Sequence, residues 1–259
     1  MVGIYVFWPY INIYQSIKSL NDHFIKIEIV NDKVNYNFVV DKPEHWVKLQ
    51  EISKRLQWAI VVSEDGKFFE HNGFDYDQYQ EAFKDAFVAK KKKVRGASTI
   101  TQQLIKNLFL GREKSIFRKV KEFMFSLIIE KQIDKQKILE TYLNIIEYGK
   151  NIYGIKSASL YYFKKYPSQL SARESAFLAM LLPSPVKYSK SFQNRMLSPF
   201  ASRIVNSVLL KMNQAGAISL DEYQNQLAST FFWETKRTLD AENSLAISEE
   251  DLINEDADE

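Results

Sequence analysis

The feature that most constrains the fold is the helical spacing of apolar residues, which starts at Trp46 and continues to about residue 229. Gly and Pro, the residues that most often end helices, number only 8 and 6 in 259 residues. The spacing therefore predicts a mainly α domain over residues 46–230. The predicted helices cover residues 46–62, 75–91, 98–110, 116–132, 135–148, 151–163, 171–182, 199–214 and 220–229.

Two different segments precede this domain. Residues 24–40, FIKIEIVNDKVNYNFVV, alternate apolar and polar residues around a central Asn-Asp pair, which predicts a small β-hairpin appendage over residues 21–45. Residues 1–14 are apolar and aromatic, but they are shorter than the roughly 20 residues that cross a bilayer. We expect residues 1–20 to lie near a membrane surface or to form a buried N-terminal segment, and the sequence leaves both alternatives open.

The charge is divided unevenly along the chain. From Thr238 onward there is no Lys or Arg, whereas this segment holds nine of the 32 acidic residues. The other 23 acids are set against all 35 basic residues, so residues 1–237 carry a net charge of +12. We expect an acidic, disordered tail over residues 231–259, and for the basic body an anionic partner such as a phosphorylated ligand, an anionic lipid or nucleic acid. The absence of cysteine excludes disulfides and cysteine-ligated metals.

Three stretches carry polar side chains in patterns that point to a site. The first is VSEDGKFFEHNGFDYD, residues 62–77, in which Glu64 directly follows an apolar run. An acidic stretch with Gly is either an ordinary helix end or a carboxylate placed for proton transfer. Asp65 and His71 have no necessary chemical task, and we expect both to be structural.

The second stretch is RGASTITQQLIKN, residues 95–107. Helical geometry places Ile100, Leu104 and Leu108 on one apolar face. The rest of the surface presents hydroxyl, amide and ammonium groups from Ser98, Thr99, Gln102, Gln103 and Lys106. Ser, Thr and Gln are poorer helix formers than an exposed face requires, so a binding face and an ordinary amphipathic surface both stay open.

The third stretch is RKVKEFMFSLIIEKQI, residues 118–133. Arg118, Lys121 and Glu122 lie together on one face at helical spacing. The residues expected to face a core are Val120, Phe123, Met124, Leu127 and Ile128. The polar face is either an exposed salt-bridged surface or part of a phosphate clamp. The further basic residues of such a clamp would be Lys106, Lys114 and Lys119.

Together these segments resemble glycosyltransferase family 51, the peptidoglycan glycosyltransferases. Five blocks follow the family's order over about residues 46–190: SEDGKFFEHNGFD, RGASTITQQLIKN, RKVKEFMFSLIIEK, KILETYLNIIEYGKNIYGI and LSARESAFLAMLLPSP. The chain is most similar to the monofunctional biosynthetic members, which lack a transpeptidase domain. Ser184-Pro-Val-Lys187 matches the S-x-x-K pattern of transpeptidases, but no S-D-N or K-T-G follows it.

The resemblance implies a lysozyme-like helical fold and a particular reaction. Glu64 would be the general base on the 4-hydroxyl of the lipid II acceptor, and Glu122 the second catalytic glutamate, near the pyrophosphate. The donor would release undecaprenyl pyrophosphate, and its α-linked sugar would become part of a β-1,4-linked glycan, so the step is inverting. The positions implied to bind substrate are Ser98, Thr99, Gln102, Gln103, Lys106, Lys114, Arg118 and Lys121.

The resemblance also implies a location and partners. The catalytic domain would lie on the periplasmic, outer face of the cytoplasmic membrane, with lipid II, the glycan strand and other wall-synthesis proteins as partners. Members usually carry an N-terminal transmembrane anchor, which we expect to be missing or incomplete in this chain. Residues 83–95, FKDAFVAKKKKVR, suit anionic lipid better than nucleic acid, and we expect no nucleic-acid partner. A divalent cation, Mg²⁺ or Mn²⁺, often assists the family, although no dedicated metal ligand set is apparent.

The chain departs from the family at two basic positions. Lys114 stands where Arg is common, and Lys164-Lys165 replaces a Gly-containing turn. Two other functions also stay open: an inactive scaffold for wall-synthesis proteins and a lysozyme-like lytic enzyme. The retained glutamates argue against the scaffold. The basic residues of the possible phosphate clamp argue against the lytic enzyme, because a glycan-cleaving site has no pyrophosphate to bind. We further predict that removing residues 238–259 leaves catalysis nearly intact.

Overall fold

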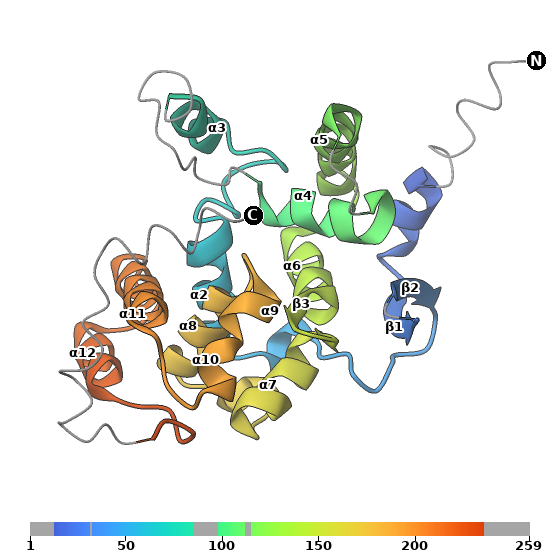
Figure 1. Cartoon of the computed structure of the whole chain (residues 1–259). Helices are drawn as coiled ribbons and strands as arrows, with labels where there is room; N and C mark the ends of the chain where they lie inside the picture. The colour runs from blue at the N-terminus through green and yellow to red at the C-terminus, as the bar shows by residue number, and fades with distance from the viewer. Residues whose placement is uncertain (1–12, 32, 85–97, 112–114, 236–259) are drawn as a thin grey trace, which may run out of the picture.

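The computed structural model describes residues 13–31, 33–84, 98–111 and 115–235, and in this part of the chain it confirms the predicted mainly α fold (Figure 1). The core forms around α8, Ala172–Leu181, whose ten residues are all buried. Its sequence, ARESAFLAML, is apolar on nearly every side, as expected for a helix that others surround. The helices α2, Lys54–Glu64, and α11, Pro199–Gln214, pack on α8, so the end of α2 is anchored in the core.

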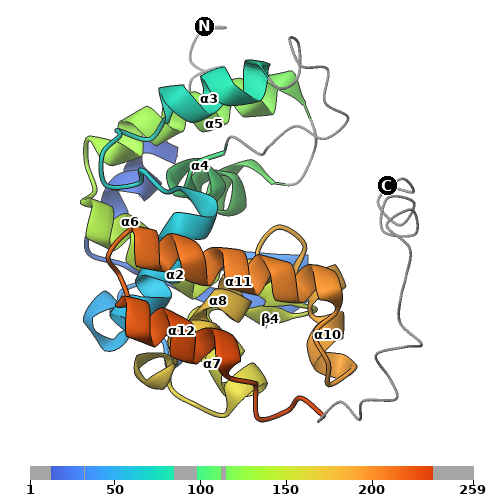
Figure 2. The same cartoon turned by 90° about the vertical axis from the view of Figure 1, so that its left-hand side faces the viewer.

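A second group of helices lies above this core in the view of Figure 1. The helix α4, Ile100–Ile105, continues into a π-helical segment, η3, Lys106–Leu110, and packs against α5, Ile116–Glu130, and α6, Lys135–Ile145. Figure 2 shows α3 and α5 at one end of the molecule, α11 across its middle, and α12 on the far side of α11 from them. The remaining helical elements are a helix over residues 13–19, η1 Leu49–Glu51, α3 Tyr76–Phe83, α7 Ile155–Phe163, η4 Pro167–Gln169, α9 Pro185–Tyr188, α10 Lys190–Gln193 and α12 Leu220–Ala228.

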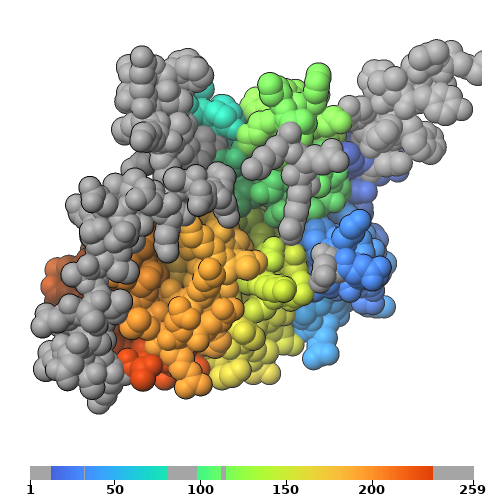
Figure 3. Space-filling view, viewed as in Figure 1, coloured from blue at the N-terminus to red at the C-terminus, as the bar shows by residue number. Residues whose placement is uncertain are grey.

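The predicted N-terminal hairpin is confirmed. The strands β1, Phe24–Val30, and β2, Lys33–Val39, pair antiparallel with Phe24 opposite Val39. The hairpin is packed onto the helices: β1 contacts α6, and Phe38 stacks on Phe109 of η3 with 6.1 Å between ring centroids. At the surface it lies beside the segment around β3 and β4 (Figure 3).

Several predicted boundaries were wrong. The helix expected over residues 46–62 starts only at Lys54, because the backbone of Val47 is instead held on both sides by Asn144, at 2.8 Å each. The helix expected over 135–148 ends at Ile145, and a second hairpin follows that the sequence did not predict. Its strands are β3, Glu147–Gly149, and β4, Ile152–Tyr153. Gly149 is needed in this hairpin because the Tyr162 hydroxyl fills the space that a side chain would occupy.

The largest error in the prediction concerns which face of α5 is buried. The residues expected to face a core are mostly exposed: Val120, Phe123, Met124 and Leu127 are 36–54% accessible, and only Ile128 packs against the core. Ile116 and Phe117 are 83% and 81% exposed. The buried face is instead Glu122, Phe125, Ser126 and Ile129. No helix within the described ranges has the length and apolar content that crossing a membrane requires.

Candidate active site

Glu64 is the last residue of α2, and two side chains control its carboxylate. Its Oε2 accepts a hydrogen bond of 2.7 Å from Gln103 Nε2 of α4. Gln103 Oε1 in turn accepts a hydrogen bond of 2.9 Å from the hydroxyl of Tyr142, a buried residue of α6. The Tyr142 hydroxyl therefore fixes the direction of the Gln103 amide, and that amide orients the carboxylate of Glu64.

The surroundings of Glu64 favour its protonated form. Burial raises the pKa of Glu64 above the ordinary carboxyl range, while the Gln103 hydrogen bond and the charge of Lys106 act in the opposite direction. The neighbouring Asp65 adds to the rise, and Lys211 opposes it. A carboxylate with a raised pKa is a stronger base, which suits a group that has to take a proton from a hydroxyl.

Asp65 ties the end of α2 to the start of α4. Its side chain is fully buried, and its Oδ2 accepts a hydrogen bond of 3.0 Å from the backbone N–H of Ile100. Its Oδ1 lies 2.8 Å from His71 Nε2. Since the backbone N–H of Gly73 donates to His71 Nδ1, the neutral ring carries its proton on Nε2 and donates it to Asp65. These contacts give Asp65 and His71 a structural task, in line with the expectation from the sequence.

Thr99 and Gln102 are placed differently from the other predicted binding residues. Both side chains are completely buried. They form a capping box at the start of α4: Thr99 Oγ1 accepts from the N–H of Gln102, and Gln102 Oε1 accepts from the N–H of Thr99. Their positions therefore support a role in shaping α4, and the direct substrate contact predicted for them has no support from this geometry.

Glu122 is the centre of a charged cluster on the buried face of α5. Its side chain is only 3% exposed and pairs with the guanidinium of Arg118 and, at 2.9 Å, with Lys119 Nζ. Lys119 Nζ also donates a hydrogen bond of 2.7 Å to Ser98 Oγ, which joins α5 to the segment that leads into α4. Burial and the nearby charges of Arg118 and Lys106 lower the pKa of Lys119. The cluster therefore concentrates positive charge beside a single buried carboxylate.

A cleft of about 330 Å³ brings part of the predicted set together. Gln103, Lys106 and Arg118 line it, and Gln103 links it to Glu64. Lys106 begins the π-helical segment η3, a type of distortion that often occurs at functional sites. The opposite wall comes from the hairpin residue Tyr36, from residues around β3 and β4, and from the chain before α9.

The other predicted residues lie outside this cleft or outside the described part. Lys121 is partly exposed on α5 and is not among the residues that line the cleft. Lys114 lies outside the described residues, as does most of the basic stretch 83–95. Within the described ranges, no cluster of three or more His, Asp or Glu side chains is arranged to hold a metal ion.

Sequence reasoning missed three contributors to the site. The sequence places Tyr142 only within the helix predicted over residues 135–148 and Tyr36 only within the hairpin, and it offers Lys119 as one of several basic residues of a possible clamp. Tyr142 and Tyr36 reach the site from elements far from Gln103 in the sequence, and no local pattern signals such a contact. The signal for Lys119 was its spacing of three from Glu122.

Comparisons with known proteins agree with the resemblance found in the sequence. The family model described as Transglycosylase matches residues 31–213. A protein of Aeromonas hydrophila subsp. hydrophila named biosynthetic peptidoglycan transglycosylase is 40% identical over 184 residues, which are 71% of this chain and 76% of that protein. Proteins of the same name from Paraburkholderia xenovorans and Bdellovibrio bacteriovorus are 42% and 39% identical over 170 and 178 residues. Those alignments cover 66% and 69% of this chain and 69% and 70% of the relatives.

Proposed function

This chain belongs to the transglycosylase family, and from that premise we propose that it polymerises lipid II into β-1,4-linked glycan strands with release of undecaprenyl pyrophosphate. The observation that carries the proposal is the pairing of an oriented carboxylate, Glu64, with the cation-lined cleft that Gln103 joins to it. Glycosyl transfer from a pyrophosphate donor needs both a base for the attacking hydroxyl and positive charge for the departing anion.

Glu64 acts as the general base. It takes the proton from the 4-hydroxyl of the acceptor GlcNAc as that oxygen attacks the anomeric carbon of the donor MurNAc. The bond from the anomeric carbon to the pyrophosphate oxygen breaks at the same time, and the α-linked donor becomes a β-linked product. Support comes from the raised pKa of Glu64 and from the Gln103 and Tyr142 hydrogen bonds that orient it.

The departing pyrophosphate is stabilised by the basic residues of the cleft. Lys106 and Arg118 line the cleft, and Lys119 holds Ser98 close by. Glu122 pairs with Arg118 and Lys119 and keeps these cations in place, so its role is to position them. Lys121 and Lys114 belong to the proposed set of basic residues, although Lys121 lies outside the cleft lining and Lys114 outside the described residues.

The residues present do not fit a resident divalent cation. Among the described residues, the buried carboxylate near the proposed pyrophosphate site is that of Glu122, which already accepts hydrogen bonds from two cationic side chains. A resident Mg²⁺ or Mn²⁺ prefers several oxygen ligands, and the described part of the chain offers no group of three or more acidic or His side chains for one. We therefore assign no step of the reaction to a metal held by the protein.

The exposed face of α5 supports a position at the membrane surface. Ile116, Phe117, Val120 and Met124 are each more than half exposed and lie on the helix that also carries the charged cluster. An apolar helix face of this kind suits insertion into the interfacial region of a bilayer. A substrate with a polyprenyl chain would then reach the cleft from the membrane, at the outer face of the cytoplasmic membrane.

The test is polymerisation of labelled lipid II by the purified protein in detergent, with the products separated on a gel. We expect polymer from the native protein and none from Glu64→Gln. If both proteins are inert where another family member is active, the scaffold function replaces the proposal. Polymer from both proteins would show that Glu64 is not the base.

A further inference from the structure

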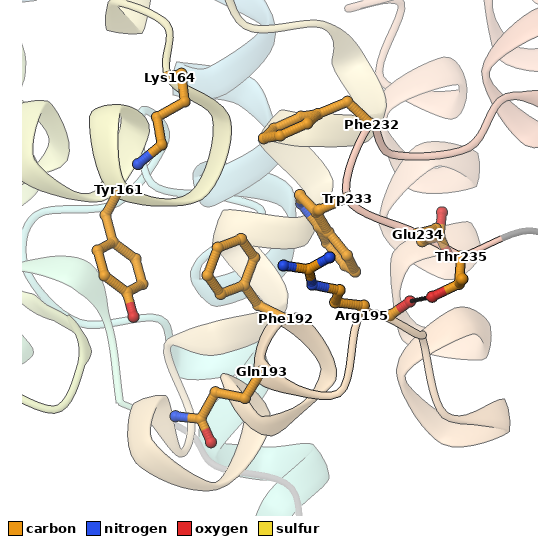
Figure 4. Close-up of a pocket in the computed structure, with 9 residues that line it drawn as sticks. All are labelled: Tyr161, Lys164, Phe192, Gln193, Arg195, Phe232, Trp233, Glu234 and Thr235. Atoms are coloured by element: carbon orange, nitrogen blue, oxygen red, sulfur yellow. Dashed lines mark hydrogen bonds between the residues drawn. The ribbon is translucent and has the colours of Figure 1, made fainter.

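A second hollow, separate from the catalytic cleft, lies between the end of α7, α10 and the segment after α12 (Figure 4). We call it the C-terminal groove; it has a volume of about 790 Å³ and shares no lining residue with the cleft. Its aromatic wall consists of Tyr161, Phe192, Phe232 and Trp233. Tyr161 is 43% exposed and Phe232 is 66% exposed. Exposed aromatic surface in a concavity of this size is typical of a binding site for a partly apolar partner.

Two cationic residues line the groove at positions whose backbone conformation favours glycine. Lys164 and Arg195 have left-handed backbone φ values of 56° and 52°. Side chains beyond Gly and Asn are disfavoured in this conformation, and Lys164 is the C-cap of α7, where Gly is common. Neither side chain pairs with an acid in the part of the chain that the structure describes. Charged residues kept at strained positions point to a use for their charge.

The basic and aromatic surface continues beyond the groove itself. One adjoining hollow shares Lys164 and adds Lys165, whose ammonium pairs with Glu174. Another shares Tyr161 and adds Lys150. The three hollows together form a surface that suits an extended segment with alternating acidic and apolar side chains.

Such a segment begins at the edge of the groove. Thr235, the last described residue, lines the groove, and its N–H donates a hydrogen bond of 3.0 Å to the carbonyl oxygen of Arg195. Beyond it, residues 238–259 contain nine acids and no Lys or Arg. Four larger apolar residues lie between those acids: Leu245, Ile247, Leu252 and Ile253. We infer that residues 238–259 dock into the C-terminal groove of the same chain, with their acids on its cations and their apolar side chains on its aromatic wall.

The covalent link makes this docking favourable even if each contact is weak. Leu245 is ten residues beyond Thr235, a span of at most roughly 33–36 Å when extended, so the chain can turn back over the groove. A tether of this length holds the segment at an effective concentration of about a millimolar. The charge contacts are surface ones, and salt therefore weakens them.

The docked segment leaves catalysis free. The groove and the cleft share no residue, so the segment does not cover Glu64 or the basic residues of the cleft. What it covers is a surface that would otherwise attract other acidic ligands. This role is compatible with the prediction that removal of residues 238–259 leaves polymerisation nearly intact.

Site-directed cross-linking in the full chain tests the inference. The chain has no native cysteine, so two introduced thiols are the only ones present. The test protein carries Gln193→Cys in the groove and Ser248→Cys in the segment, and the control protein carries Asn35→Cys on β2 with Ser248→Cys. A short bis-maleimide in dilute protein at low salt should link the groove pair about tenfold faster than the control pair.

Charge-removing variants then decide whether the groove's cations are responsible. Lys164→Gly with Arg195→Gly should abolish the faster cross-linking without loss of the fold, because glycine adopts both left-handed positions easily. A matched control, Lys33→Gln with Lys48→Gln, removes two exposed positive charges elsewhere and should leave it unchanged. Equal rates for both cysteine pairs, or fast cross-linking that survives the glycine changes, would overturn the inference. Cross-linked dimers in place of internal links would also overturn it, since the segment would then dock on a second copy.

Discussion

Glu64 and Glu122 are the two acids on which the proposed site depends, and the structure gives them opposite surroundings. Glu64 is partly buried, accepts a hydrogen bond from a neutral amide, and has a raised pKa. Glu122 is almost completely buried and pairs with two cations. The first environment favours uptake of a proton, whereas the second stabilises a fixed negative charge. The comparison shows that partners, more than residue type, decide which carboxylate exchanges protons and which one positions neighbouring groups.

The largest expected effect separates the two acids by activity. Glu64→Gln should lower kcat by about 10²–10⁴-fold, because the amide keeps the shape of the side chain but cannot take a proton. The measurement is the initial rate of polymerisation of labelled lipid II, with Glu70→Gln, an exposed acid of the same stretch, as the matched control. A rate within tenfold of the native enzyme would remove Glu64 from the role of base.

The next effect separates them by stability. Glu122→Ala should lower the free energy of unfolding by about 1–3 kcal/mol, since it leaves Arg118 and Lys119 without their shared partner; both are partly exposed, which moderates the loss. Urea unfolding followed by circular dichroism measures this change. Adding Lys119→Met to Glu122→Ala should recover part of the loss if the ion pairs are its cause. If the double variant loses as much as both single changes together, Glu122 stabilises the protein through other contacts.

The sequence alone singled out these two acids as candidate site residues and predicted most of the helices, because both inferences rest on local patterns. Glu64 ends a helix within a distinctive block, and the hairpin follows from alternation around Asn31. Ile100 and Leu104 are buried as their spacing predicted. The partners of each acid were harder to predict, since the Tyr142 hydroxyl meets Gln103 across 39 residues of sequence.

Periodicity did not predict which face of α5 is buried. It also did not predict which polar residues of α4 are structural and which line the cleft. Both faces of α5 contain apolar residues at helical spacing, and the buried face is the one on which Glu122 forms its ion pairs. On α4, one polar stripe divides into two functions: Thr99 and Gln102 cap the helix, while Gln103 and Lys106 line the cleft. Hydrogen bonds between distant elements make this division, and spacing alone does not record them.

A smaller effect tests whether Glu64 is held at a cost to stability. Because its folded-state pKa is raised, ionisation destabilises the fold, and Glu64→Gln should increase the free energy of unfolding by about 0.5–1 kcal/mol at pH 7. The stability that the protonated form contributes is fully present below the unfolded-state value of 4.5 and is lost as pH rises through the folded-state pKa. The difference in unfolding free energy between variant and native protein should therefore vanish below pH 4.5 and grow as the pH rises above it. A loss of stability at neutral pH would contradict this account and make Glu64 resemble Glu122.

The smallest expected effect concerns a residue that does not line the cleft. Lys211 of α11 lowers the pKa of Glu64 through its charge alone, and it is the weakest of the causes that act on this carboxyl. Lys211→Met should raise that pKa slightly, so the acid limb of the kcat/KM profile against pH moves to higher pH while the plateau rate stays the same. Lys211→Arg keeps the charge and should leave the limb in place. Since Lys211 lies outside the cleft, a shift produced only by the Met variant would link the acid limb to Glu64 electrostatically. The alternative outcome is an acid limb that does not move in Lys211→Met but does move when Glu122 is changed. In that case Glu122 is the titrating group, and the roles of the two carboxylates would be reversed.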